Sequence, residues 1–224
     1  MARSREKAID ILEKIAVLFP EAHCELVHSS AFELAVAVIL SAQATDVSVN
    51  KISPALFARF PTAFAMAQAT IPEIESYIRS IGLYRNKAKS LSALAKRLVE
   101  QYDGEIPNTF EQMIELPGIG RKSANVLLSV WFDIPAFAVD THVERISKRL
   151  QFSKQDDSVL EVEKKMCKAI PKELWNRAHH YFIFFGRYLC KAQRPECERC
   201  PLQEYCSYFK QKQKEEARKQ KSVK

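Results

Sequence analysis

The chain has 224 residues, a net charge of +7, and ordinary fractions of hydrophobic (47%) and charged (27%) residues. This length allows one large or two small domains, each with a buried core. No apolar run approaches the ~20 residues that a membrane-spanning helix needs, and the charged N-terminus is unlike a signal peptide. The sequence therefore predicts a cytoplasmic protein with no membrane partner.

The basic charge is concentrated near the C-terminus. Residues 210–224 contain seven basic and two acidic side chains, so they carry five of the seven net positive charges. We expect this segment to form a flexible basic tail. The remaining chain is close to neutral, and the net charge says little about what it binds.

Apolar residues recur at helical spacing along most of the chain, and no segment shows the alternation of a β-strand. The pattern predicts an all-α protein with helices that include residues 4–19, 31–41, 87–101 and 122–132. The segment 31–41 is apolar on nearly all sides, so it should be a central, buried helix.

A polar loop follows this apolar helix, in the sequence Leu-Ser-Ala-Gln-Ala-Thr-Asp at residues 40–46. Thr45 or Asp46 should cap the next helix. Capping does not account for Gln43, which stands in the middle of the loop.

A second loop precedes the predicted helix 87–101. Gly82 suits a left-handed helix stop, after which Leu83 either packs back on its own helix or stays at the surface. Arg85, Lys87 and Lys89 follow, and these cations either face solvent or meet phosphates.

Residues 116–125 read Leu-Pro-Gly-Ile-Gly-Arg-Lys-Ser-Ala-Asn and join two predicted helices. Glycine permits positive φ and lets a ligand approach the backbone closely. The free N–H groups at the start of the second helix favour an anion such as phosphate. Leu116 and Ile119 should hold the turn in the core, and Lys122 stands at the mouth of the second helix. The turn alone is also compatible with an ordinary helix–turn–helix corner.

Residues 137–146 read Phe-Ala-Val-Asp-Thr-His-Val-Glu-Arg-Ile and start another helix. Thr141 and Glu144 fit a capping box, which makes Thr141 the N-cap and leaves Asp140 outside the helix. Asp140 as the N-cap is the alternative.

Four cysteines, Cys190, Cys197, Cys200 and Cys206, follow the pattern Cys-x6-Cys-x2-Cys-x5-Cys. Nothing in the chain indicates an oxidising compartment, so disulfides are not expected. The surrounding segment is too polar to bury four structural cysteines, and the pattern favours a metal site. Spacing alone does not decide between zinc and a [4Fe–4S] cluster.

These motifs together resemble the endonuclease III family of DNA glycosylases, in the same order and over roughly residues 5–208. The resemblance implies two helical lobes flanking a DNA-binding cleft. A six-helix domain at residues 24–134 would carry the helix-hairpin-helix, and residues 1–23 with 135–209 would form an iron–sulfur domain. It further implies a [4Fe–4S] cofactor held by the four cysteines, damaged double-stranded DNA as the partner, and a monomer.

The resemblance also assigns roles to individual residues. Lys122 and Asp140 would be catalytic, while Gln43 and Leu83 would enter the DNA helix beside the displaced nucleotide. Further DNA contacts are expected at Leu116, Gly118, Ile119, Gly120, Arg121, His142, Lys191 and Arg194.

The residue types suit this chemistry. Removing a base and nicking the strand needs an amine that forms a Schiff base at C1′, which the guanidinium of Arg121 cannot do. A protonated lysine is inert, so the pKa of Lys122 has to fall; a helix N-terminus and partial burial both act in that direction.

The predicted function is a base-excision-repair DNA glycosylase with AP-lyase (β-elimination) activity on oxidised pyrimidines. One alternative is the adenine-from-mispair branch of the same superfamily, which typically lacks a lysine at this position and carries an additional C-terminal domain. The other is a non-catalytic DNA-binding module. The presence of Lys122 counts against the first alternative, and the presence of Lys122 and Asp140 together counts against the second.

Overall fold

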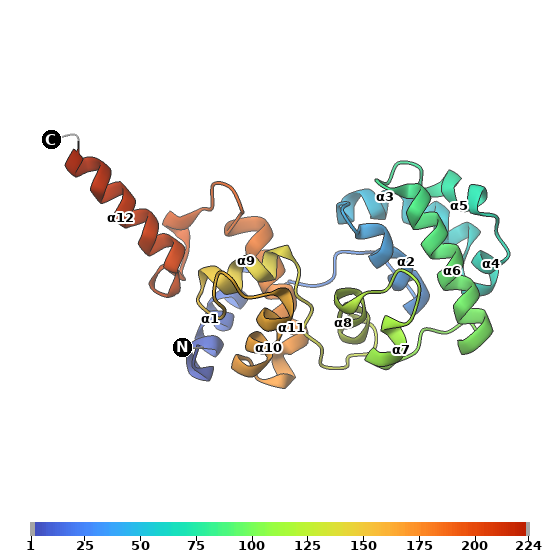
Figure 1. Ribbon diagram of the computed structural model, residues 1–224, viewed down its shortest axis with the longest axis horizontal. Helices are drawn as coiled ribbons and strands as arrows, with labels where there is room; N and C mark the ends of the chain where they lie inside the picture. The colour runs from blue at the N-terminus through green and yellow to red at the C-terminus, as the bar shows by residue number, and fades with distance from the viewer. Residues whose placement is uncertain (1–2, 223–224) are drawn as a thin grey trace. The chain divides into compact units, whose positions relative to one another are not determined.

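The protein is all-α, as predicted. A computed structural model describes residues 3–222, with side chains to residue 218, and this part of the chain contains helices and loops but no strand. Figure 1 shows the order of the helices along the chain. Over the same residues, no helix is long and apolar enough to cross a membrane.

The chain forms two compact units. One is the continuous segment Cys24–Ala136, and the other combines Met1–His23 with Phe137–Lys224. The boundary thus lies two residues beyond the expected 134, after Ala136 and not after Ile134.

The unit Cys24–Ala136 is built around α2 (Ala31–Ser41), which contacts α3, α6 and α8. Every residue of α2 except Glu33 and Ser41 is buried, because the helix is apolar on nearly all sides. This unit contains seven helices, one more than the six expected. Besides α2, they are α3 (Asp46–Arg59), α4 (Ala63–Ala67), α5 (Ile71–Ile78), α6 (Tyr84–Tyr102), α7 (Phe110–Ile114) and α8 (Arg121–Val130). Two of the seven, α4 and α7, have only five residues each.

The other unit brings the N-terminal helix against the C-terminal part of the chain. Its elements are α1 (Arg5–Leu18), α9 (Thr141–Arg149), α10 (Val159–Ala169), η1 (Lys172–Leu174), α11 (Trp175–Phe184), η2 (Phe185–Leu189), η3 (Cys197–Arg199), η4 (Gln203–Tyr205) and α12 (Ser207–Ser222). One apolar cluster runs through it, from Ile11 and Ile15 of α1 to Phe182 of α11 and Cys206. Burial of this cluster is the main force that joins the two ends of the chain.

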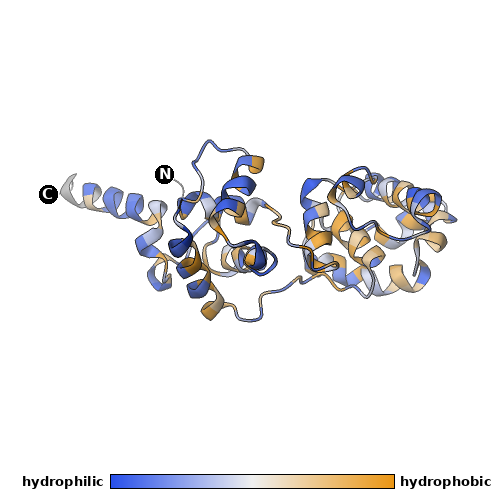
Figure 2. Ribbon diagram, turned by 90° about the horizontal axis from the view of Figure 1, so that it is seen from below, coloured by the Kyte–Doolittle hydropathy of each residue, from blue (hydrophilic) through white to orange (hydrophobic). Residues whose placement is uncertain are grey.

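The expected flexible tail is a helix. Residues 210–222 belong to α12, which Figure 2 shows as almost wholly hydrophilic. Gln211 bonds to Glu215, and Lys212 pairs with Glu216 at 3.6 Å. Lys, Gln, Glu, Ala and Arg are strong helix formers, and pairs four residues apart stabilise an exposed helix. The charge of this segment predicts a tail, whereas its helix propensity accounts for the helix.

Candidate functional site

The hairpin between α7 and α8 depends on one glycine. Gly118 has φ +81, and a Cβ at this position would lie 3.1 Å from Ile39 Cδ1 and 3.2 Å from Ser90 Cβ. The turn is therefore pressed against α2 and α6, and only glycine fits there without strain. Leu116 and Ile119 are 3% and 4% exposed, so they hold the turn in the core as expected.

The burial of Leu116 and Ile119 limits which atoms of the hairpin can contact DNA. The side chains of Leu116 and Ile119 are covered, so a contact to DNA at these positions has to use backbone atoms. Gly118 and Gly120 are exposed, and Gly120 is the N-cap of α8. The first N–H groups of a helix have no acceptor within it and carry partial positive charge. The turn therefore presents an anion-binding backbone.

Lys122 is the second residue of α8, and its side chain is exposed. The partial burial that the sequence led us to expect is absent within the Cys24–Ala136 unit. The neighbouring Arg121 stacks over the ring of Phe110 at 4.8 Å. Lys122 thus stands exposed at the end of a fixed hairpin.

Asp140 is the N-cap of α9, so the capping-box interpretation with Thr141 as the cap is wrong. Asp140 Oδ1 accepts hydrogen bonds of 2.8 Å from the backbone N–H groups of His142 and Val143. Glu144, which would complete the box by reaching back, instead pairs with Lys148 at 2.6 Å. A carboxylate that accepts two backbone N–H groups at a helix N-terminus is held in one orientation.

The second oxygen of this carboxylate faces a histidine. Asp140 Oδ2 lies 3.0 Å from His142 Nδ1, and the Asp140 side chain is only 12% exposed. Gly186 of η2 packs against His142, because a Cβ on Gly186 would come within 2.9 Å of His142 Cβ. His142, expected as a DNA contact, is thus also a partner of Asp140.

The two residues expected to enter the DNA helix both have left-handed backbones. Gln43 has φ +55 and Leu83 has φ +60. Leu83 is 58% exposed, while Gln43 is also exposed. The predicted left-handed stop at Gly82 is wrong, since Leu83 takes that conformation instead and directly precedes α6. Leucine seldom adopts positive φ, and such strain gathers at functional positions.

Lys87 is buried, which excludes the phosphate contact considered for it. The residue lies within the Cys24–Ala136 unit and is 6% exposed. The ammonium Nζ donates to the carbonyl oxygens of Leu40 at 2.9 Å and Ala42 at 2.7 Å. Nothing in the sequence around Lys87 indicates this contact, because a lysine near the start of a charged helix is usually solvated.

The four cysteines line a single cavity. Cys190, Cys197, Cys200 and Cys206 all face it, together with Pro195, Gln203 and Phe209. Among the described residues, no group of three or more His, Cys, Asp or Glu is arranged to hold a metal ion. A [4Fe–4S] cluster takes one thiolate on each of four irons, and four thiols around one cavity fit that ligand set.

Burial favours the protonated form of three of these thiols. It raises the pKa of Cys190 and Cys197, and the pKa of Cys200 rises to about 11. Because iron binds the thiolate, loading the site has to release these protons.

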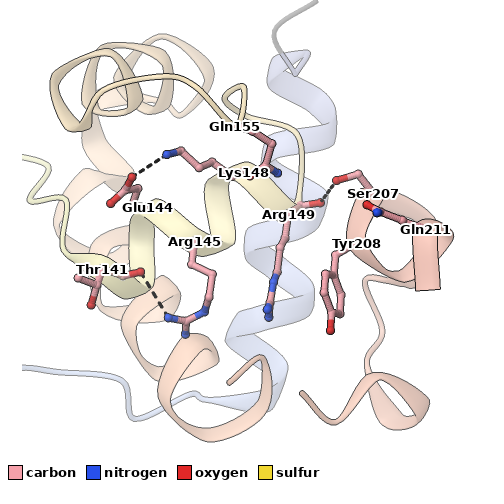
Figure 3. Close-up of a pocket in the computed structure, with 9 residues that line it drawn as sticks. All are labelled: Thr141, Glu144, Arg145, Lys148, Arg149, Gln155, Ser207, Tyr208 and Gln211. Carbon is pink, nitrogen blue, oxygen red and sulfur yellow. Dashed lines mark hydrogen bonds and ion pairs between the residues drawn. The ribbon is translucent and has the colours of Figure 1, made fainter. Parts of the chain in front are cut away.

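Figure 3 shows the side chains of Arg145 and Arg149 leaving α9 on the same side, with Arg149 beside Tyr208. These two arginines tie α9 to the cysteine segment. Arg145 Nη2 donates to Gly186 O at 2.9 Å and to Cys190 O at 3.2 Å. Arg149 Nη1 donates to Lys191 O at 2.9 Å and lies 3.2 Å from Cys190 Sγ, and its guanidinium stacks on Tyr208. The sequence pattern indicates no role for Arg145, and only the structure reveals its bonds to Gly186 and Cys190.

The loop between the first two cysteines is exposed. Lys191 pairs with Glu196 at 2.9 Å, and Arg194 has a left-handed backbone with φ +49. Both side chains are at the surface, where a phosphate can reach them.

Comparisons with known proteins identify the family. The model of the HhH-GPD superfamily base excision DNA repair proteins matches residues 36–172. The model of the iron-sulfur binding domain of endonuclease III matches residues 190–206, from the first cysteine to the last.

Individual relatives belong to the same family as the two matching family models. Endonuclease III of Bacillus subtilis (strain 168) is 53% identical over 195 residues, which span 87% of this chain and 89% of that protein. Endonuclease III of Escherichia coli (strain K12) is 41% identical over 205 residues, 92% of this chain and 97% of that protein.

Among solved structures, a trapped covalent intermediate of endonuclease III with DNA has a TM-score of 0.91 at 51% identity, covering 94% of this chain and 99% of that one. A thermostable thymine-DNA glycosylase has a TM-score of 0.85 at 20% identity, covering 92% and 98%, which shows a shared fold. The chain therefore belongs to the endonuclease III family of the HhH-GPD superfamily: it is a DNA-binding base-excision-repair glycosylase with AP-lyase activity and a [4Fe–4S] cluster.

Proposed function

We propose that this enzyme removes oxidised pyrimidines from double-stranded DNA and then cleaves the strand, with Lys122 as the nucleophile. The observation that carries the proposal is the exposed amine of Lys122 on the first turn of α8, beside the Gly118–Gly120 turn. A nitrogen lone pair attacks C1′ of the sugar as the glycosidic bond breaks, and the base leaves with the bonding electrons and takes up a proton. The C1′–O4′ bond then breaks, O4′ takes up a proton, and the opened sugar is left as a Schiff base. The Schiff base acidifies the C2′ proton, and loss of this proton expels the 3′ phosphate.

Asp140 supplies the carboxylate for this reaction. Its Oδ1 is held by two N–H groups and its Oδ2 lies at the His142 ring, so the charge is fixed before substrate binds. A fixed carboxylate stabilises positive charge that develops on the sugar and accepts a proton from the amine.

The substrate base has to leave the duplex before Lys122 can reach C1′. Flipping costs a few kcal/mol and costs less for damaged, weakly stacked bases, which favours lesions over normal nucleotides. Gln43 and Leu83 fill the vacated space; both are exposed on left-handed turns. The backbone N–H groups at Gly118 and Gly120 hold a phosphate without reading sequence.

The cysteine segment supplies a second DNA contact. When bound, the [4Fe–4S] cluster fixes the fold of residues 190–206, and Lys191 and Arg194 then meet the phosphate backbone. The enzyme works as a monomer, and since the relatives named above are bacterial, it acts in the cytoplasm.

A base-release and trapping assay tests the proposal. Duplexes that contain an oxidised pyrimidine, an adenine opposite an oxidised guanine, or an abasic site are incubated with the cluster-loaded enzyme and borohydride. We expect release and covalent trapping with the first substrate, and trapping with the abasic one. Lys122→Gln should abolish trapping, while Lys96→Gln, at another exposed lysine, should leave it unchanged.

Three results would contradict the proposal. Trapping by Lys122→Gln at the level of the parent would show that another amine is the nucleophile. Release of adenine alone would indicate the mispair branch. Binding of every duplex without release or nicking would leave only a DNA-binding role.

A further inference from the structure

We infer that Lys87 is a positioning residue that locks the turn of Gln43 and the turn of Leu83 to each other. The inference rests on the proposed insertion of these two side chains into DNA. Lys87 itself is 6% exposed, so it acts on DNA only through the turns that it holds.

The first link runs to the end of α2. Lys87 Nζ donates to Leu40 O and Ala42 O, at 2.9 Å and 2.7 Å. These carbonyls belong to the last turn of α2 and to its C-cap, Ala42, which immediately precedes the left-handed Gln43. A cation suits this place, since the C-terminal carbonyls of a helix carry partial negative charge.

The second link is the backbone of the same residue. The N–H of Lys87 donates to the carbonyl of Leu83 at 3.1 Å, which closes the first turn of α6 over the left-handed Leu83. One residue therefore bonds to both turns, through its side chain on one side and its main chain on the other. The turns lie about 40 residues apart in sequence, and Lys87 bonds directly to both.

The choice of lysine supports this interpretation. Burial lowers the pKa of Lys87, because removing an ammonium group from water is unfavourable. A methionine would fill a similar volume without that cost. What it lacks is the pair of charged hydrogen bonds to Leu40 and Ala42, so these bonds account for the buried cation.

The test compares Lys87→Met with Lys96→Met, which removes an exposed lysine of the same helix. With cluster-loaded enzyme in excess, Lys87→Met should slow base release about ten-fold, the effect of ~1.4 kcal/mol. A fluorescent base analogue next to the lesion should report less flipping. Affinity for undamaged DNA and its salt dependence should match the parent, because no phosphate contact is lost. Lys96→Met should match the parent in all of these.

The decisive comparison uses a background without the inserting side chains. In Gln43→Ala/Leu83→Ala, Lys87 has nothing left to position, so adding Lys87→Met should change base release by less than about two-fold. A further ten-fold loss there would overturn the inference and indicate a general structural role. The proposed function would still stand in that case. If Gln43→Ala/Leu83→Ala releases base as fast as the parent, the insertion roles fail, and this inference fails with them.

Hydrogen exchange of the unaltered protein tests whether the turns of Gln43 and Leu83 open together, even if Lys87→Met does not fold. In the unaltered protein, the amide of Ala44 bonds to Ser41 O and that of Lys87 bonds to Leu83 O. If the turns open together, the protection factors of these two amides should agree within about three-fold. A hundred-fold difference would show that the turns open independently, which would overturn the inference.

Discussion

The carboxylate of Asp140 and the ring of His142 face each other across the first turn of α9, with Oδ2 3.0 Å from Nδ1. The other oxygen, Oδ1, accepts from the N–H groups of His142 and Val143. Asp140 therefore has two tasks, to cap a helix and to present a fixed negative charge.

Substitutions separate these tasks. Asparagine caps a helix as well as aspartate does, whereas alanine loses about 1 kcal/mol at an N-cap. Asp140→Asn should therefore retain the parent's urea midpoint, and Asp140→Ala should lower the free energy of unfolding by about 1 kcal/mol. Both should slow base release by at least ~100-fold, as expected when an acid–base group is removed. Parent-like release by Asp140→Asn would show that only the cap matters.

Leu83 offers a similar separation of stability from activity. An L-residue in the left-handed region is strained by about 1–2 kcal/mol, a strain that glycine escapes. Glycine in turn lowers the free energy of unfolding by about 0.4–1 kcal/mol relative to alanine, because its unfolded chain has more conformational entropy to lose. Leu83→Gly should thus be more stable than Leu83→Ala by roughly 0.5–1 kcal/mol in urea unfolding.

Both variants lack the exposed apolar side chain, so both should lose base release to the same extent. If Leu83→Ala is the more stable of the two, the left-handed backbone is not strained. If either variant keeps full activity, Leu83 does not insert into DNA.

Gly118 is the position in the hairpin where a methyl group should be least tolerated. Its φ of +81 is strained for any other residue, and an added Cβ would lie 3.1 Å from Ile39 Cδ1 and 3.2 Å from Ser90 Cβ, so these neighbours would have to shift. Gly118→Ala should lower the free energy of unfolding by at least ~1 kcal/mol, and should weaken DNA binding as the turn shifts.

Gly120→Ala is the matched control. Gly120 has φ −97, and a Cβ there meets no heavy atom within 4 Å. Its loss of stability should stay near ~0.5 kcal/mol, the difference between glycine and alanine at an N-cap. Equal losses for the two variants would mean that packing of Gly118 against α2 and α6 is unimportant.

The sequence predicted those features that depend on local pattern. The buried helix Ala31–Ser41 matched its prediction residue for residue, because its apolar run and its capping Ser30 both act locally. The burial of Leu116 and Ile119 followed from the turn between two apolar helices. The order of motifs, which identified the family, is likewise a property of the chain alone.

Features that depend on contacts between distant segments were missed or wrong. The pattern around Lys87 is that of a solvated helix start, and only the fold brings its ammonium to the carbonyls of Leu40 and Ala42. Glycine was expected to take the left-handed position before α6, yet Leu83 takes it. Thr141 and Glu144 matched a capping box, but Glu144 pairs with Lys148 and Asp140 caps the helix. Local sequence patterns indicate which partners a residue could have, and contacts between distant segments determine which partner it has in the fold.

His180 should make the stability of the protein depend on pH. Burial lowers the pKa of His180 from 6.5 to about 3, helped by His179, His23 and Arg187 nearby. The folded protein therefore keeps this ring neutral, while the unfolded chain binds a proton as pH falls below 6.5. Because the unfolded state then holds more protons, stability should fall with decreasing pH by up to about 1.4 kcal/mol per pH unit. Above neutral pH the ring is neutral in both states and contributes no slope.

Urea unfolding of the parent and of His180→Gln at pH 7.5 and pH 5.5 measures this effect. At pH 7.5 the difference in the free energy of unfolding between the two proteins reflects only packing, because His180 is unprotonated in both the folded and the unfolded parent. At pH 5.5 the parent should have lost up to about 1.4 kcal/mol more than the variant, because the variant has no ring to protonate. Acid effects on the cluster are common to both proteins and cancel in the comparison. Equal losses of stability in the parent and His180→Gln would show that His180 protonates as readily in the folded protein as in the unfolded chain.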